Sequence, residues 1–160
     1  MTAVPKIDID KVPVDTYSAY PEEFRRDVVG RERKRLGNAA GLDHYGVNLC
    51  RLKPGAASSQ RHWHQHEDEF VYMLEGEVVL AEDGGETILR PGDAVGWKAG
   101  VANGHRLINR TSRDAVFLEI GTRAPREVAT YPDIDMRAER DGRTQRYVHK
   151  DGTPYPESKR

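Results

Sequence analysis

Residues 61–69 read Arg61-His62-Trp63-His64-Gln65-His66-Glu67-Asp68-Glu69 and hold three of the six histidines of this chain. Alternate side chains of a β-strand share a face, so His62 and His64 point to the same side. A turn over residues 66–68 lets Glu69 begin an antiparallel return strand and face back toward both histidines. Two imidazoles and one carboxylate that meet in this way are typical ligands of a divalent transition metal.

His105 offers a fourth ligand, because it opens a candidate strand after a glycine-containing loop. A five- or six-coordinate ion held by these four residues keeps positions open for water or substrate, unlike a closed structural zinc site. The ligands suit Fe, Mn, Ni, Zn and Cu alike, so we expect one divalent transition metal ion per chain without naming it. His66 shares the parity of His62 and His64 and is an alternative ligand, although its place in the turn favours a solvated position.

Short apolar runs separated by turn residues extend over residues 45–121. Glycine or proline recurs too often there for a ten-residue helix, and the pattern is typical of an antiparallel barrel or sandwich. We expect strands at Tyr45–Leu52, Gln60–His64, Glu69–Leu74, Glu77–Ala81, Thr87–Leu89, Ala94–Trp97, His105–Asn109 and Ala115–Ile120.

The flanking segments, residues 1–44 and 122–160, are polar and broken by prolines, so we expect irregular extensions around a barrel of residues 45–121. The C-terminal extension has no core of its own and should pack on the barrel or on a partner subunit. Its candidates for ordered structure are Val128–Met136 and Arg146–His149. The basic run Arg31-Glu32-Arg33-Lys34-Arg35 is interpreted as a solvated face, because one acid interrupts it and aromatic partners are absent.

Composition excludes several classes of protein. The 160 residues include 25 basic and 26 acidic side chains, which is not the strongly basic balance of a nucleic-acid binder. No apolar run approaches the length of a membrane span, and the first ten residues lack the apolar region of a signal peptide. The single cysteine, Cys50, fits a reducing compartment. We therefore expect a cytoplasmic protein without nucleic-acid or membrane partners.

The spacing around the histidines resembles the cupin superfamily. Gly55, six residues, His62-Trp63-His64, four residues, Glu69, six residues and Gly76 are similar to its first motif, with one extra residue in the first spacing. Gly92, Lys98-Ala99-Gly100, His105 and Asn109 are similar to its second motif, with Lys98 in place of a proline and a loop two residues longer. The tail segments 131–135 and 149–155 resemble those of bacterial single-domain cupins grouped with sugar-phosphate isomerases.

This resemblance implies an all-β, cupin-type antiparallel barrel (a jelly roll) with a metal inside, held by His62, His64, Glu69 and His105, and a homodimer. It also implies that the protein binds or converts a small polar molecule, foremost as a sugar-phosphate isomerase or epimerase. A metal-dependent dioxygenase and a non-catalytic small-molecule-binding cupin are alternatives, since the same ligands serve all three. The sequence assigns no catalytic residue. Parity and loop position give the candidate pocket residues Gln60, Val71, Met73, Lys98 and Leu107.

Overall fold

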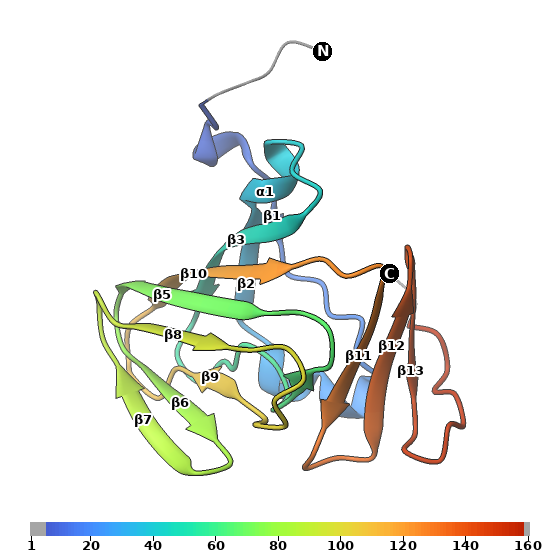
Figure 1. The fold of residues 1–160 in the computed structure, drawn as a ribbon. Helices are drawn as coiled ribbons and strands as arrows, with labels where there is room; N and C mark the ends of the chain where they lie inside the picture. Colours follow the sequence, from blue (N-terminus) through green and yellow to red (C-terminus); the bar gives the residue numbers. More distant parts are fainter. Residues whose placement is uncertain (1–5, 159–160) are drawn as a thin grey trace.

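Antiparallel strands dominate the structure, a computed structural model that describes residues 6–158 (Figure 1). The largest sheet has the order β1-β2-β3-β10-β5-β8, and a smaller sheet has the order β7-β6-β9. The large sheet consists of β1 (Val14–Asp15), β2 (Arg31–Arg35), β3 (Tyr45–Leu52), β10 (Ala115–Thr122), β5 (Glu69–Glu75) and β8 (Ala94–Trp97). The small sheet consists of β7 (Gly85–Leu89), β6 (Val78–Glu82) and β9 (Arg106–Ile108). The predicted all-β fold is confirmed, and β3 and β8 have the expected bounds.

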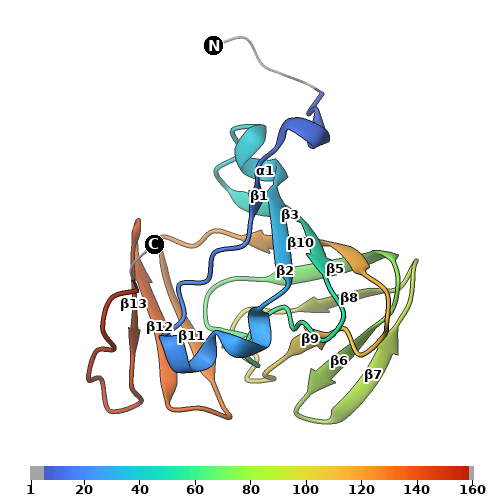
Figure 2. The ribbon, with the colours of Figure 1, turned by 180° about the vertical axis from the view of Figure 1, so that it is seen from behind.

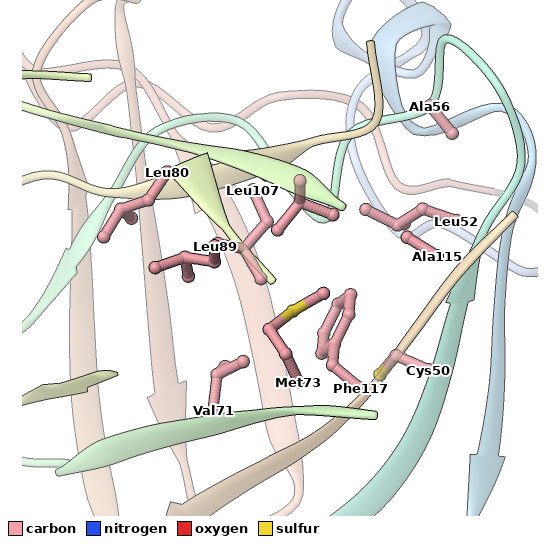
Figure 3. Packing of buried hydrophobic residues seen from close by; sticks show 11 residues of the cluster. Cys50, Leu52, Ala56, Val71, Met73, Leu80, Leu89, Leu107, Ala115 and Phe117 are labelled. Carbon is pink, nitrogen blue, oxygen red and sulfur yellow. The ribbon is translucent and has the colours of Figure 1, made fainter. Parts of the chain in front are cut away.

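The apolar core fills the space between these two sheets (Figure 3). Phe117 on β10 stands in register with Cys50 on β3 and with Met73 on β5, and all three side chains are buried. Leu80, Leu89 and Leu107 cover them from the small sheet. Burying such a side chain stabilises the fold by about 1.5–3 kcal/mol. Two residues further along the inner faces of β3 and β10, these apolar side chains give way to Asn48 and Glu119, so the polar end of the barrel begins there.

Residues 126–148 form three strands where the sequence predicts an irregular extension. β11 (Arg126–Tyr131), β12 (Met136–Asp141) and β13 (Thr144–Val148) pair antiparallel, and β4 (Trp63–His64) joins the free edge of β11. Pro132 lies in the turn between β11 and β12, so its missing N–H interrupts no strand pairing. Figure 1 shows this sheet standing beside the barrel.

The N-terminal segment packs against the C-terminal sheet and builds a second core with it (Figure 2). Tyr20 and Val28 are buried there against Ala129, Tyr131 and Met136. The segment contains β1 and β2, three 3-10 turns and one short helix: η1 (Ile9–Lys11), η2 (Glu22–Phe24), η3 (Arg26–Val28) and α1 (Leu36–Ala39). Within residues 6–158, no helix combines the length and the apolar character needed to cross a bilayer.

Candidate metal centre

The four predicted metal ligands, three from residues 62–69 and the fourth His105, lie near one another at the polar end of the barrel. His62 Nε2 lies 3.1 Å from His64 Nε2, and His105 Nε2 lies 2.6 Å from Glu69 Oε2. The same carboxylate oxygen is 3.4 Å from His64 Nε2 and 3.8 Å from His62 Nε2. His62, Glu69 and His105 therefore form one group of potential ligands, and His64, which contacts that group, also belongs to a second one with Glu67 and Glu127.

The prediction that residues 60–64 and 69–74 pair with each other as a hairpin is wrong. His64 and Trp63 on β4 pair with Ala129 and Thr130 of β11, while β5 pairs with β10 and β8. His62 instead forms a two-way backbone pair with His105. Glu69 thus reaches the histidines from the large sheet across the barrel, and not from an adjacent strand.

Backbone carbonyls fix the tautomers of two of the histidines. His62 Nδ1 lies 2.9 Å from the carbonyl oxygen of Gln60, and His105 Nδ1 lies 3.2 Å from that of Asn103. Since a carbonyl oxygen only accepts, both Nδ1 atoms donate, and the Nε2 of each neutral ring keeps a lone pair. The Nε2 lone pair of His105 then faces a carboxylate oxygen at 2.6 Å, a contact that needs a proton or a cation between the two acceptors.

The donor set fits a divalent transition metal. Ligand atoms about 2.0–2.1 Å from an ion and at right angles to each other are about 3 Å apart, and three of the contacts here, at 2.6, 3.1 and 3.4 Å, are near that separation. Histidine ligands also hydrogen-bond through their second nitrogen to carbonyl or carboxylate groups, as His62 and His105 do. These residues could therefore hold one metal ion.

Neighbouring groups hold the rings in place. Trp97 stacks on His105 with ring centroids 3.8 Å apart and planes 6° apart, and its Nε1–H donates to Glu82. His64 Nδ1 is buried, has no hydrogen-bond partner among residues 6–158, and lies 3.9 Å from a carboxylate oxygen of Glu127. Sequence reasoning missed Glu127, which is buried on β11 and accepts the backbone N–H groups of Gln65 and His66. The side chain of His66 is exposed, as its place in the turn predicts.

Burial and charge set the protonation of the cluster. Burial lowers the pKa of His62 to about 4, so this ring is neutral at pH 7. For Glu69, burial alone would raise the pKa, but the close imidazole rings of His105 and His64 hold it well below its usual value. For His64, burial would lower the pKa, but the hydrogen bond and charge of Glu69 outweigh it and raise the pKa. An ionised carboxylate beside a neutral imidazole is the state that binds a metal cation.

A cavity of about 400 Å³ opens beside this cluster, and its wall includes His62, His64 and Glu69. Glu119, a carboxylate outside the predicted ligand set, lines the same cavity. On β10 it stands opposite Val71, while Gly121 stands opposite Glu69, so Glu119 is a diagonal neighbour of Glu69 on the inner face. Sequence reasoning missed Glu119, although its parity with the inward-facing Phe117 was available as a signal.

Three groups contact the Glu119 carboxylate, one of which is the thiol of Cys50 at 3.5 Å. Arg33 Nε lies 3.3 Å from the carboxylate, and the Asn48 amide donates to it at 3.2 Å. Burial alone would raise the pKa of Glu119, but the charge of Arg33 and the amide hydrogen bond lower it. Glu119 is therefore ionised at pH 7 while it lies beside the candidate metal cluster.

The predicted pocket residues take different places. Val71 and Leu107 line a small space of about 20 Å³ together with His62, Glu69 and His105. The other three lie elsewhere: Met73 is in the apolar core, Gln60 donates to the carbonyl oxygen of Phe24 and to Asp27, and Lys98 is exposed. A role of these five residues in binding a substrate stays a prediction.

Comparison with known proteins identifies the family. Residues 48–121 match the Cupin domain family. The structure is similar to that of a sugar phosphate isomerase from a cupin superfamily of Silicibacter pomeroyi, with a TM-score of 0.92 and 45% identity over 95% of this chain and 97% of that one. This chain belongs to the cupin superfamily.

Other solved structures resemble this cupin less closely. A candidate sugar phosphate isomerase from Acidithiobacillus ferrooxidans has a TM-score of 0.72 and 32% identity, over 80% of this cupin and 81% of that chain. The polyketide cyclase RemF from Streptomyces resistomycificus shares the fold, with a TM-score of 0.61 and 19% identity over 74% of this cupin and 79% of that chain. No curated protein matches this cupin.

Proposed function

We propose that this cupin is a metal-dependent isomerase of a small phosphorylated sugar. One observation carries the proposal: a carboxylate outside the ligand set, Glu119, lines one polar cavity with His62, His64 and Glu69, and the fourth donor, His105, contacts Glu69. Two similar structures belong to proteins named as a sugar phosphate isomerase and as a candidate for that activity.

The metal would be held by His62, His64, Glu69 and His105, as one divalent transition metal ion per chain. When bound, such an ion supplies a Lewis acid that polarises a carbonyl oxygen. The carbonyl acceptors of His62 and His105 orient two of the rings toward this position.

Glu119 would move the proton. An aldose becomes a ketose when a proton leaves the hydroxyl-bearing carbon and returns to the former carbonyl carbon, while one proton passes between the two oxygens. An ionised carboxylate beside the reacting carbons can accept the first proton and deliver it to the neighbouring carbon. Arg33 and Asn48 hold Glu119 ionised and in place for this transfer.

The character of the cavity wall favours this function over its alternatives. Arginine, glutamate, serine and tyrosine side chains line the space beside the cluster, whereas the apolar Val71 and Leu107 line only the small space beneath it. A polar, anionic substrate fits such a wall better than an apolar substrate of a dioxygenase. The dioxygenase and the non-catalytic binding protein are the other outcomes of the experiment below.

The test combines metal analysis with proton NMR in D₂O. We expect about one equivalent of metal in protein purified without chelators, and interconversion of an aldose phosphate and a ketose phosphate with deuterium entering the exchanged carbon. Glu119→Gln should keep the metal and lower kcat about 10²–10⁴-fold. Glu32→Gln, on the outer face of β2, is the matched control and should keep full activity. Substrate-dependent oxygen uptake, or binding of sugar phosphates without interconversion, would overturn the proposal.

A further inference from the structure

Three arginines of β2 face the cavity beside the candidate metal centre. Arg31, Arg33 and Arg35 occupy alternate positions of this strand and all line the 400 Å³ cavity. Glu32 and Lys34 point to the other side and line a separate space of about 180 Å³. The interpretation of residues 31–35 as a solvated face is therefore wrong for Arg31, which is buried, and for Arg33, whose side chain is 19% exposed, whereas Arg35 is exposed, at 48%.

Arg31 makes no direct ion pair with an acid within the described residues. Its guanidinium donates to the carbonyl oxygens of Ser58, at 2.8 Å, and Tyr17, at 3.3 Å. No carboxylate of residues 6–158 forms an ion pair with it. Carbonyl oxygens orient a guanidinium but carry no net charge, and burying a cation without a counter-charge is costly. A bound anion would supply that counter-charge.

The charges around the cavity lead to the same class of ligand. The three arginines are matched by Glu69, by Glu119 and by Asp15, which pairs with Arg35 at 2.7 Å. A divalent metal on the four-residue cluster would leave two positive charges in the cavity. A phosphate monoester, which carries up to two negative charges at pH 7, would neutralise them.

We propose that the row Arg31, Arg33 and Arg35 binds the phosphate group of the substrate, so that the reactive end of the sugar lies at the metal cluster. This proposal rests on the function proposed above. Guanidinium groups present paired N–H donors that match phosphate oxygens. Because side-chain exposure increases along the row, Arg35 lies where the phosphate would enter and Arg31 lies where the bound phosphate would be most enclosed.

The test measures the binding of inorganic phosphate to the full chain by calorimetry. Arg35→Gln should weaken phosphate binding about tenfold, since a hydrogen bond to a charged group contributes roughly that factor or more. Lys34→Gln makes the same charge change on the opposite face of the same strand and should leave the affinity within about twofold. Arg31→Lys keeps the buried charge but loses the paired donors, and it should also weaken binding while the circular dichroism spectrum stays unchanged.

Kinetics separate this proposal from the proposed function. With a sugar phosphate as substrate, Arg35→Gln should raise KM about tenfold and leave kcat nearly unchanged. Equal phosphate affinity and equal KM in Arg35→Gln and Lys34→Gln would refute phosphate binding by the arginine row, even if the protein is an active isomerase. Phosphate binding that is lost in His105→Ala but kept in Arg35→Gln would show that phosphate binds to the metal, and it would also refute phosphate binding by the arginine row. If the arginine row binds phosphate but the protein has no isomerase activity, the phosphate site is supported and only the proposed isomerase function is refuted.

Discussion

Gly76, which closes the first histidine-containing motif, should be intolerant of a methyl group. It follows β5 with a φ of +71°, a conformation that side chains disfavour. A Cβ built on it would lie 2.4 Å from the carbonyl oxygen of Asp114 and 2.8 Å from the Cα of Ala115. Both atoms belong to the backbone at the start of β10, so no side-chain rotation relieves the overlap.

The magnitude follows from two contributions. A left-handed backbone costs a residue with a Cβ about 1–2 kcal/mol, and forcing packed backbone apart costs about 1–3 kcal/mol more. Gly76→Ala should therefore lower the free energy of unfolding by about 2–5 kcal/mol. Gly142, in the β12–β13 turn, has a φ of +58° with nothing within 4 Å of its Cβ position, so Gly142→Ala should cost only the first contribution.

Urea denaturation of the metal-free protein, followed by tryptophan fluorescence, compares the two variants. With a denaturant slope of about 2 kcal/mol/M, a loss of about 3 kcal/mol lowers the midpoint by about 1.5 M urea. Gly142→Ala should lower it by about 0.5–1 M. Equal shifts in both variants would refute the reasoning, because they would show that the close approach of β10 to Gly76 has no energetic consequence.

Three further predictions concern the metal cluster, the buried ion pair and the second core. His105→Ala should lose most bound metal in elemental analysis, while His66→Ala should keep it. Metal loss from His66→Ala would contradict the assignment of the histidine ligands. Glu119→Gln should destabilise the protein by about 1–3 kcal/mol at pH 7, because it removes the charge that pairs with the largely enclosed Arg33 guanidinium. Since the pKa of Glu119 is lowered on folding, the ion pair stabilises fully above the unfolded value near pH 4.5 and is lost as the pH falls through the lower folded value. The stability gap between wild type and Glu119→Gln, from urea denaturation, should therefore narrow from pH 7 to pH 3.5, and a constant gap would contradict this assignment. Met136→Ala should cost about 2–5 kcal/mol in the same assay, since Met136 is fully buried between the N-terminal segment and the C-terminal sheet; a loss below about 1 kcal/mol would show that this second core contributes little.

The parts of the fold that were predictable are those in which one side of a strand is apolar. In β3, Cys50 and Leu52 alternate with outward-facing residues, and the structure gives this strand its predicted bounds. His62 and His64 share a face for the same reason of parity, and the chain order of the motif brought Glu69 and His105 into the candidate set.

The strand partners were not predictable from local pattern. β4 has two residues and pairs with chain about sixty-five positions later, a contact that only the assembled barrel defines. On β11 the inward positions are Glu127, Ala129 and Tyr131, so a carboxylate interrupts the apolar alternation that would signal a strand. On β2 both faces are polar, and hydropathy therefore contains no information about which face covers the cavity.

The pairing of β4 with β11 couples the end of the chain to the metal cluster. His64 sits in the backbone pairing with Ala129, and the N–H of the next residue, Gln65, donates to the carbonyl oxygen of Val128 at 3.0 Å. Thermodynamic linkage is reciprocal, so a metal ion bound through His64 would stabilise the docked C-terminal sheet by the same free energy with which that sheet would improve metal affinity. Changes in residues 126–148 can therefore tune how tightly the metal is retained without altering any ligand, and occupancy of the cluster can be followed from afar as slower amide hydrogen exchange in β11.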